Sequence, residues 1–423
     1  MSLSRQQWVG LEENRQNREK QASGSGFGVD LQGNNRCAHA QTSPIWRALS
    51  DVCERMINFM KKKVAVIGYG GMGGWDVNML SGVYGPQLDP AFFEFGGIYD
   101  IDPAKTKLAQ EKGYYAYPSF EALLADKSVD VLTVAIPNDQ HKDICIAAMN
   151  AKKNVICEKP VTLNVHDLNE MFAAAKRNHV AFSVHQNRRW DPDFLDMKNL
   201  YETHRLGDVF YVECRVHGSR GIPGDWRNRK ECGGGMLYDW GVHLIDQMFQ
   251  MVKEPVKSFY ATLTYVTNEF CDDGFKILVN FESGLQYHLE VGTSNFISMP
   301  HWYMLGNNGS AIMNGWEPKE GKITMVSDWE NKDAVPIIAG VGLTKTMAPR
   351  TDDSIKDYPL PDINISVAEY YKNFAKACCG EEELTVSHKQ MHRVMTFVDA
   401  AFESAAEDKV IKDFEQRCLS FND

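Results

Sequence analysis

From Lys61 onward, short apolar runs alternate with stretches that have helical periodicity. The runs at 63–67, 129–136 and 154–157 show little polar alternation, which is typical of strands buried on both faces of a parallel sheet. Parallel strands need crossover connections, and the helical stretches supply them. The pattern predicts an α/β fold, a doubly wound parallel sheet of the Rossmann type, over residues 61–185.

The other elements of this domain follow from the same pattern. Helix-start and helix-stop residues mark some of the boundaries, such as Pro103 and Gly113 on either side of one helical stretch. Because ligands bind outside the carboxyl ends of the strands in such sheets, we expect the functional residues there. Strands are expected at 95–100, 114–117 and 180–185, and helices at 103–112, up to Ala125, at 140–151 and at 164–178.

After about Asp191 the pattern changes. The runs 256–267, 275–281 and 285–293 alternate apolar and polar residues, are rich in β-branched and aromatic side chains, and are separated by glycine-containing turns. This pattern predicts antiparallel strands. With two terminal helices at 367–378 and 388–407, residues 186–423 are expected to form an α+β domain with a large open antiparallel sheet.

Residues 1–60 differ from both domains. The first forty are polar with few large apolar side chains, so they cannot offset the entropy lost on ordering, and 43–60 could form one amphipathic helix. No continuous apolar segment of the kind found in a secretory signal is present. We interpret 1–60 as a poorly ordered extension, with Met56 or Met60 as the natural start.

Composition and charge narrow the possible functions. The net charge of −11 argues against non-specific nucleic-acid binding, which needs clustered Lys and Arg, and no apolar run is long enough to cross a bilayer. The ten cysteines include no C-x-x-C pair, so neither a zinc site nor a disulfide framework is indicated. A cytoplasmic protein that holds no metal and acts on a small molecule is expected.

A glycine-rich turn follows the first strand. Gly68, Gly70 and Gly73 have G-x-G-x-x-G spacing, in which the glycines allow a sharp turn, a close approach by a pyrophosphate, and tight packing of the next helix. The following strand ends in Asp100, about where the hydroxyls of a ribose would lie. The interval is longer than the usual ~20 residues, and we assign the excess to the loop around Gly85. The two features predict a dinucleotide site.

Lys159 lies in the sequence Glu158-Lys159-Pro160, at the carboxyl end of an expected strand. An arbitrary lysine in a loop is usually solvated, but this position, the adjacent Glu and the rigid Pro favour a functional role. Because an oxidised nicotinamide is a cation, it would favour the neutral form of a neighbouring amine. Such an amine could take the proton of a hydroxyl as hydride leaves the carbon.

Asp239 and His243 stand four residues apart in a glycine-led block, and therefore on one face of a helix expected to begin near Gly235. An acid and an imidazole facing one cleft suit proton relay and orientation of a substrate hydroxyl. The alternative is an ordinary Asp near the helix start beside a buried, satisfied His. A metal site from Asp239, His243 and Asp246 is possible in principle, but no ligand pattern such as H-x-x-x-H supports it.

Two further stretches carry candidate binding residues. Gln186 and Arg188 could hydrogen-bond a carboxamide or substrate oxygens, whereas Arg189 is expected to pack the seam between the domains. In the loop at 217–227, Trp226 offers a flat face suited to sugar rings, with Asp225 and Arg227 as hydroxyl partners; an ordinary surface loop is the alternative there.

These residues together resemble the glucose–fructose oxidoreductase / inositol dehydrogenase / rhizopine-catabolism (Gfo/Idh/MocA) family over nearly all of residues 61–415. The resemblance rests on Gly68-Tyr69-Gly70-Gly71-Met72-Gly73, Ile136-Pro137-Asn138 with His141, Glu158-Lys159-Pro160, and the block 235–246. The run 186–191 looks like the branch that acts on inositols, glycosides and their keto forms. Two features depart from the family: residues 1–60 have no counterpart, and Asp76 stands where many members carry His.

The resemblance implies hydride transfer between NAD(H) or NADP(H) and a hydroxyl-bearing carbon of a sugar, cyclitol or related polyol. It implies Lys159, Asp239 and His243 as the catalytic group, an often cis Lys159–Pro160 peptide, and a homo-oligomer joined through the C-terminal sheet. The substrate-binding residues it implies are Arg188, Trp226, Arg227, Asp239 and His243. The cofactor-binding residues it implies are Gly68, Tyr69, Gly70, Gly71, Met72, Gly73, Asp100, Ile101, Ile136, Pro137, Asn138, His141, Glu158, Lys159 and Gln186.

The leading interpretation is an NAD-dependent dehydrogenase that oxidises a secondary ring hydroxyl of a sugar, glycoside or inositol to a ketone. NAD is preferred to NADP because Asp100 would repel a 2′-phosphate. One alternative is an enzyme that retains NAD and uses transient oxidation to eliminate a glycosidic group. Another is a sugar-sensing regulator on the same scaffold; such proteins tend to lose the lysine or the histidine, and this chain keeps both.

Overall fold

The computed structural model describes residues 61–86, 88–330 and 335–421. The expected N-terminal extension and its amphipathic helix lie outside the described residues. No helix among the described residues is long and apolar enough to span a membrane.

The first part of the described chain is the expected Rossmann-type domain. Its five strands are all parallel and have the order β2-β1-β3-β4-β5, which confirms the predicted α/β class. Helices begin where the sequence supplies caps: the side chains of Asp102, Ser119 and Asn164 each accept a hydrogen bond from a backbone amide of the first turn. The strands are β1 (Lys62–Ile67), β2 (Phe93–Tyr99), β3 (Val131–Val134), β4 (Asn154–Cys157) and β5 (Phe182–Val184), and the helices are α3 (Gly71–Leu80), α4 (Pro103–Glu111), α5 (Phe120–Ala125), α6 (His141–Asn150) and α7 (Val165–Asn178).

The prediction of a strand at 114–117 is wrong, because the pairing there is shorter than a strand. Only a single parallel bridge forms there, between Ala116 and Ile98, with Ile98 N donating to Tyr115 O and Tyr117 N donating to Ile98 O. Pro118 follows and has no N–H to continue the ladder, so the pairing ends at once.

The second part contains an eight-stranded sheet of order β15-β12-β11-β10-β6-β9-β8-β7. All its pairs are antiparallel except β6 with β9, which is parallel, so the large, mostly antiparallel sheet predicted for this domain is confirmed. A helical segment, and not a hairpin, leads from β6 to the β7–β9 meander, so no tight turn forces these two strands to run in opposite directions. The strands are β6 (Val209–His217), β7 (Val256–Thr264), β8 (Gly274–Phe281), β9 (Gln286–Gly292), β10 (Trp302–Gly306), β11 (Gly309–Met313), β12 (Gly321–Val326) and β15 (Ile355–Tyr358).

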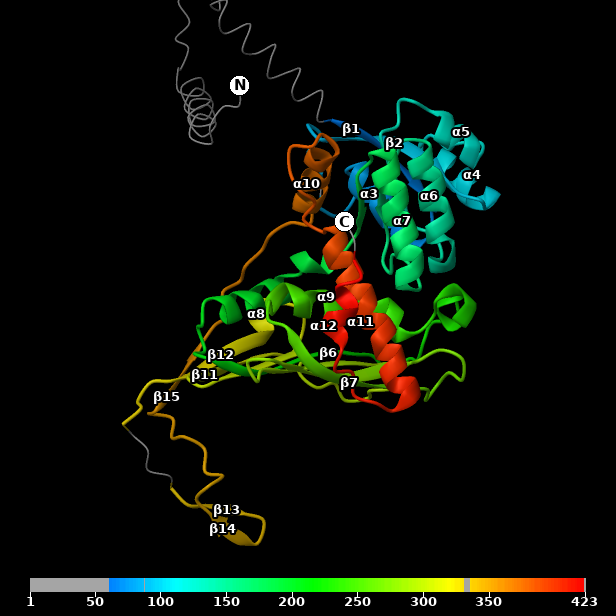
Figure 1. The fold of residues 1–423 in the computed structure, drawn as a ribbon. Helices are drawn as coiled ribbons and strands as arrows, with labels where there is room; N and C mark the ends of the chain where they lie inside the picture. The colour runs from blue at the N-terminus through cyan, green and yellow to red at the C-terminus, as the bar shows by residue number, and fades with distance from the viewer. Residues whose placement is uncertain (1–60, 87, 331–334, 422–423) are drawn as a thin grey trace, which may run out of the picture. The chain divides into compact units, whose positions relative to one another are not determined.

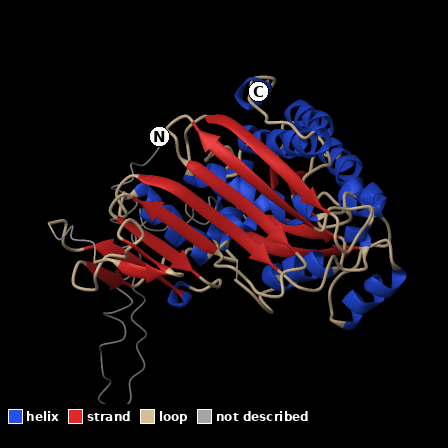
Figure 2. Cartoon of the chain, turned by 90° about the horizontal axis from the view of Figure 1, so that it is seen from below, coloured by secondary structure: helices blue, strands red, loops and turns tan. Residues whose placement is uncertain are grey.

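Helices cover one face of this sheet and leave the other bare. Figure 1 shows α8 (Pro192–Glu202), α9 (Val242–Met251), α11 (His388–Glu407) and α12 (Phe414–Cys418) on one side, and Figure 2 shows the opposite face with no helix in front of the strands. A hairpin of β13 (Ile337–Ala339) and β14 (Gly342–Thr344) forms a separate two-stranded sheet on an arm between β12 and β15.

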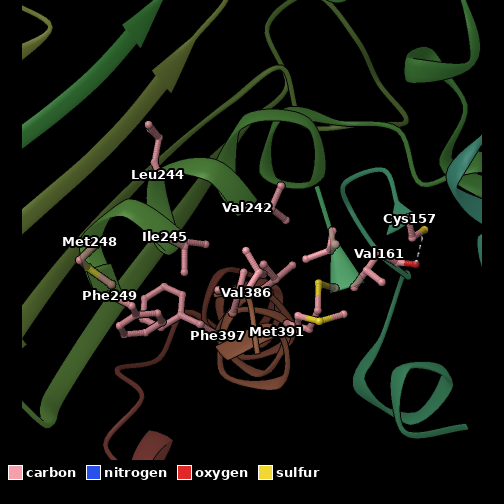
Figure 3. Close-up of a cluster of buried hydrophobic side chains, with 14 of the residues drawn as sticks. Cys157, Val161, Val242, Leu244, Ile245, Met248, Phe249, Val386, Met391 and Phe397 are labelled. Atoms are coloured by element: carbon pink, nitrogen blue, oxygen red, sulfur yellow. Dashed lines mark hydrogen bonds between the residues drawn. The ribbon is translucent and has the colours of Figure 1, made fainter. Parts of the chain in front are cut away.

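The core of the second part lies between α9 and α11. Nine of the ten residues of α9 are buried, and the rings of Phe249 and Phe397 lie 5.6 Å apart. Figure 3 shows Ile245 and Phe249 of α9 facing Val386 and Phe397. Because α9 carries His243 close to its first residue, this packing fixes the position of the imidazole.

Helix α10 (Ala368–Cys378) packs on the parallel-sheet domain, although the helix lies far from that domain in the sequence (Figure 1). The ring of Tyr371 lies 5.9 Å from Phe93 of β2 and 5.2 Å from His185, which follows β5. Ser183 of β5 also donates a hydrogen bond to the carbonyl of Val386. The two domains are therefore interlocked by the returning chain.

Candidate active site

The glycine turn between β1 and α3 has the geometry that its spacing predicts. Gly68 has a φ of +93°, and a Cβ there would lie 2.2 Å from the carbonyl oxygen of Ala135. A Cβ on Gly73 would lie 1.9 Å from the carbonyl oxygen of Gly68, so the helix approaches the turn as closely as a glycine allows. A Cβ on Gly70 would meet nothing within 4 Å, which leaves open space where a pyrophosphate would approach the N-terminus of α3.

Asp100 lies beside this turn at the carboxyl end of β2. Its Oδ2 accepts a hydrogen bond from the backbone amide of Tyr69 (2.6 Å), and its Oδ1 accepts one from that of Asp102 (2.8 Å). The carboxylate is thus held against the turn, where the hydroxyls of an adenosine ribose would lie in a dinucleotide complex. Ile101 is 88% exposed beside it, so a cofactor could cover its apolar side chain. The turn and the acid fit a dinucleotide.

The carboxyl end of β3 supplies the next expected cofactor residues. Asn138 is buried and donates through Nδ2 to the carbonyl of Gly233 (3.1 Å). His141 is also buried, with Nδ1 2.9 Å from the carbonyl oxygen of Pro160 and Nε2 3.0 Å from that of Ile136. Both ring nitrogens of His141 therefore face protein carbonyls, and the imidazole links the end of β3 to the cis-proline segment after β4.

Lys159 and Asp239 meet across the two domains. The Nζ of Lys159 donates to Oδ1 of Asp239 (2.7 Å) and to the backbone carbonyl of Asp239 (2.8 Å). The peptide between Lys159 and Pro160 is cis, as the family resemblance implies. Burial works against the carboxylate, but the charges of Lys159 and then Arg227, whose Nε is 3.4 Å from Oδ2, bring the pKa of Asp239 below its ordinary value. Each side chain of the Lys159–Asp239 pair remains 15% exposed, so a substrate can reach it.

The segment that carries Asp239 differs from the expected α-helix. Residues Leu237–Gly241 form one π-helical turn, and the α-helix begins only at Val242. Gly235 enters the turn with a φ of +106°, and Asp272 accepts a hydrogen bond from the amide of Leu237 (2.7 Å). Such single π-turns are frequent at functional sites, because they shift side chains relative to the regular helix. Sequence spacing alone does not distinguish this turn from an α-helical one.

His243 follows this turn and is buried. Among the described residues its Nδ1 has no hydrogen-bond partner. Burial, and then the positive charges of Lys159 and Arg188, hold the pKa of His243 well below its ordinary value. The ring is therefore a neutral imidazole at neutral pH, which can accept a hydrogen bond or a proton from a substrate hydroxyl. The structure thus brings Lys159 into contact with Asp239 and places the charge of Lys159 close enough to His243 to affect its pKa.

A second cluster lies directly behind Lys159. Asp76 of α3, Glu158 and His185 are buried, and their ligand atoms lie within 4.8 Å of one another, so they could in principle hold a metal ion. However, Nδ1 of His185 is 2.6 Å from Oε1 of Glu158, closer than the roughly 3.3 Å between two ligands of a tetrahedral zinc ion. The distance fits a shared proton better than a shared metal.

The charges in this cluster are unequal. Burial opposes ionisation of both partners, yet their mutual attraction brings the pKa of Glu158 below and that of His185 above its ordinary value. Burial, and then the charge of Glu158, raise the pKa of Asp76 to about 8, so this acid is mostly protonated at neutral pH. The cluster is therefore an ion pair beside a neutral carboxylic acid. Asp76 Oδ1 lies 3.4 Å from the hydroxyl of Tyr371, which comes from α10.

Two residues near the site, Arg189 and Gln186, are buried. Arg189 is buried and makes a bidentate ion pair with Asp246 of α9 (2.6 and 2.7 Å), as expected for the seam between the domains. This pairing also removes Asp246 from any metal site with Asp239 and His243. Gln186 is buried, with Oε1 lacking a hydrogen-bond partner among the described residues.

Aromatic side chains line the outer side of the site. The guanidinium of Arg188 lies over the ring of Trp240 (4.2 Å to the centroid) and over that of Trp316 (5.2 Å). On the other side of Asp239, the guanidinium of Arg227 lies 4.5 Å from the ring of Trp226. Arg188, Trp226 and Arg227 were expected from the sequence, whereas Trp240 and Trp316 were not. Trp240 adjoins Asp239 and could have been noticed, but Trp316 comes from a distant loop without any local signal.

Two family models match the chain. The NAD-binding Rossmann-fold domain of the GFO/IDH/MocA oxidoreductase family matches residues 62–186, and the C-terminal domain of the same family matches residues 194–312.

Individual proteins are similar over both domains. The NADP(+)-dependent scyllo-inositol 2-dehydrogenase of Bacillus subtilis is 26% identical over 358 residues, which cover 82% of this chain and 95% of that protein. An oxidoreductase of Schizosaccharomyces pombe is 30% identical over 251 residues, covering 55% of this chain and 67% of that protein. The crystal structure of an NAD-binding protein from Listeria innocua has a TM-score of 0.79 and 40% sequence identity, and the match covers 83% of this chain and 99% of that one.

Proposed function

Because this chain belongs to the Gfo/Idh/MocA family of NAD(P)-dependent oxidoreductases, we propose that it oxidises a secondary ring hydroxyl of a sugar, glycoside or inositol to a ketone, with NAD as the hydride acceptor. The observation that carries the proposal is the contact between Lys159 and Asp239 (2.7 Å). The pair is partly open to solvent and lies at the carboxyl end of β4, in the crevice where doubly wound sheets bind nucleotides.

When NAD is bound, its nicotinamide supplies the hydride acceptor, and the residues of this chain handle the proton. The amine of Lys159 takes the hydroxyl proton as the carbon loses hydride, so that alcohol becomes ketone and amine becomes ammonium. Asp239 stabilises this ammonium and fixes its direction. In the reverse reaction the same ammonium returns the proton to the carbonyl oxygen.

His243 orients the substrate in this scheme. The imidazole is neutral because burial and the nearby charges of Lys159 and Arg188 oppose an imidazolium. It hydrogen-bonds the reacting hydroxyl or relays the proton of that hydroxyl. Arg188, Trp226 and Arg227 surround the remaining hydroxyls. The inositol dehydrogenases among the similar proteins support a polyol substrate.

The preference for NAD rests on Asp100. A 2′-phosphate would meet the carboxylate that Tyr69 N and Asp102 N hold against the glycine turn. The similar Bacillus subtilis enzyme is named for NADP(+), so the preference needs a direct measurement. We expect kcat/KM to be higher with NAD than with NADP, and Asp100→Ala to lower that ratio about tenfold or more, whereas Glu94→Gln at the other end of β2 leaves it unchanged. Activity of the wild type with NADP alone would contradict the assignment.

The bare face of the eight-stranded sheet (Figure 2) is the surface through which we expect a homo-oligomer to form. An extended sheet face without a covering layer is a common place for subunits to associate. Light scattering after size exclusion measures the mass in solution, and a monomer of 47.8 kDa at working concentration would contradict this part of the proposal.

The experiment that tests the proposal is a cofactor-reduction screen over inositols, hexoses, uronic acids and glycosides, with the Lys159→Met variant beside the wild type. We expect the wild type to release NADH in proportion to ketone formed, which also separates a dehydrogenase from an enzyme that retains NAD. Lys159→Met should abolish turnover while NAD binding, followed by fluorescence, is largely kept. Lys127→Met, on the exposed surface of the same domain, is the matched control. Substantial turnover by Lys159→Met would remove this lysine from its role.

A further inference from the structure

Trp240, Arg188 and Trp316 form a stack on the outer side of the catalytic residues, which we call the aromatic stack. The guanidinium carbon of Arg188 is 4.2 Å from the centroid of the Trp240 ring and 5.2 Å from that of Trp316, and the two indoles lie 5.8 Å apart. The three residues come from different parts of the chain. Arg188 lies in a short turn after β5, Trp240 in the π-turn before α9, and Trp316 in the loop between β11 and β12.

The stack adjoins the catalytic group at one end. Trp240 follows Asp239 in sequence, and its ring centroid is 6.1 Å from that of His243. The guanidinium of Arg188 lies over the same Trp240 ring, 4.2 Å from its centroid. A group attached to the sugar ring held at His243 would therefore meet Trp240 and Arg188 first.

At its other end the stack opens to solvent. The side chain of Trp316 is 42% exposed and that of Arg188 is 27% exposed. A cluster that served packing alone would be closed, whereas this one presents an indole and a guanidinium beside a catalytic pair. Such surfaces bind flat or ring-shaped groups, because an indole stacks on the C–H face of a sugar or on an aromatic ring.

Trp316 is held in place from behind. Its ring lies 4.2 Å from the imidazole of His301, and Nε2 of His301 is 2.8 Å from Oδ2 of Asp193, which also accepts from the indole of Trp302. His301 and Asp193 are both buried.

The loop itself is also ordered. Glu317 and Glu320 cap each other's backbone amides, and the amide of Asn314 donates to the carbonyl of Glu320 (3.1 Å). A binding surface that is already ordered loses little entropy when its ligand arrives. The loop between β11 and β12 thus places Trp316, already ordered, beside a site whose proposed catalytic residues follow β4 and begin α9.

We propose that the aromatic stack binds the second ring of a two-ring substrate, an aryl glycoside or disaccharide, whose first ring is oxidised at Lys159 and His243. This inference rests on the proposed function and narrows its substrate class. A free hexose or inositol would fill the catalytic position and leave Trp316 exposed to solvent.

An anionic substrate such as a uronic acid is the competing class. Arg188 already pairs with Asp191, whose Oδ2 is 2.8 Å from its Nη1, so the local positive charge is largely compensated. This compensation weakens the attraction for a carboxylate and therefore favours a neutral second ring.

The test compares matched glycosides that differ only in the aglycone. For sugars that the wild type oxidises, kcat/KM is measured for the methyl and the phenyl glycoside of both anomers with NAD. We expect the phenyl glycoside to be preferred, and Trp316→Ala to lower the phenyl-to-methyl ratio of kcat/KM about tenfold, mainly through KM. Trp316→Phe should restore most of the ratio because a ring remains.

Trp329→Ala is the matched control, since Trp329 is 48% exposed and lies under Arg350 (4.9 Å) at a separate place after β12. It should leave the ratio unchanged, and thermal unfolding of each variant shows whether the fold is kept.

Three outcomes would overturn the inference: no phenyl preference in a wild type that oxidises single rings, an equal loss on both glycosides in Trp316→Ala, or a preference for uronic acids that Trp316→Ala leaves in place. In each of these cases the proposed function survives, because single rings are still oxidised. A wild type that oxidises no sugar, glycoside or cyclitol would contradict the proposed function, and this inference with it.

Discussion

The ammonium of Lys159 and the carboxylate of Asp239 lie 2.7 Å apart, although 80 residues separate them in the chain. The lysine follows β4 of the parallel sheet by two residues, and the acid belongs to the π-turn that leads into α9. The contact therefore joins the NAD-binding domain to the C-terminal domain.

Replacing Asp239 with Asn should weaken catalysis strongly. The amide keeps the shape but cannot stabilise the ammonium that forms on Lys159, so we expect kcat to fall by roughly 10²–10³-fold, in the range of a lost acid–base group. NADH formation at saturating substrate measures this. Asp357→Asn, in an exposed ion pair with Lys322 at the sheet edge, is the control and should keep full activity. A loss of only twofold in Asp239→Asn would contradict the role.

The pH dependence of activity should report a neutral His243. Burial and nearby positive charges hold the pKa of His243 well below 6.5. Protonation of its imidazole should therefore not lower kcat/KM until the pH is well below that value. Arg188→Met removes one of those charges, so the pKa of His243 rises and any acid limb moves to higher pH. Arg229→Met, on an exposed residue, should leave the profile in place. The inference fails if the wild type loses activity with an apparent pKa near 7 and His243→Asn removes that acid limb, because the limb would then belong to the imidazole and not to Lys159.

Asp76 makes the protein less stable as the pH rises. Its pKa rises from 3.8 in the unfolded chain to about 8 in the folded one, mainly through burial. Between these values the unfolded chain releases a proton that the folded chain keeps, so the free energy of unfolding falls with rising pH, by about 1.4 kcal/mol for each pH unit.

The neutral variant Asp76→Asn should lack this loss. Relative to the wild type, its free energy of unfolding should increase by up to about 4 kcal/mol between pH 5 and pH 8, as measured by urea denaturation. Asp352→Asn, at an exposed position, serves as the control. Parallel pH curves for Asp76→Asn and the wild type would show that Asp76 is ionised in the folded protein.

Adjacent glycines in α3 should respond differently to alanine. A Cβ on Gly73 would lie 1.9 Å from the backbone oxygen of Gly68, whereas a Cβ on Gly74 would meet nothing within 4 Å. Gly73→Ala is expected to lower the free energy of unfolding by about 1–3 kcal/mol and to weaken NAD binding, because backbone must move. Gly74→Ala should be neutral or stabilising by up to about 1 kcal/mol, because alanine favours a helix interior. Thermal unfolding and NAD titration of both variants decide the point, and equal stabilities would refute it.

The sequence by itself determined the first domain and its cofactor edge. Gly68, Asp100 and Lys159 each follow the carboxyl end of a strand within two residues, and the carboxyl ends of parallel strands necessarily share one edge of the sheet. Local rules therefore suffice to bring these residues near one another. The same rules predicted the main helices and most strands, because buried parallel strands and capped helices have strong local patterns.

Only the tertiary structure decided what surrounds this edge. The sequence predicts a regular helix before His243, but the structure has a π-turn there, with Gly235 and Leu237 held against Asp272. Asp76 meets Tyr371 across 295 residues, and Trp316 reaches Arg188 from a loop of the sheet. Such contacts depend on how two domains pack on each other, which involves shape and volume summed over many side chains. No periodicity or local motif encodes that sum. The candidate catalytic lysine can therefore be found from the sequence, whereas the aromatic stack beside it cannot.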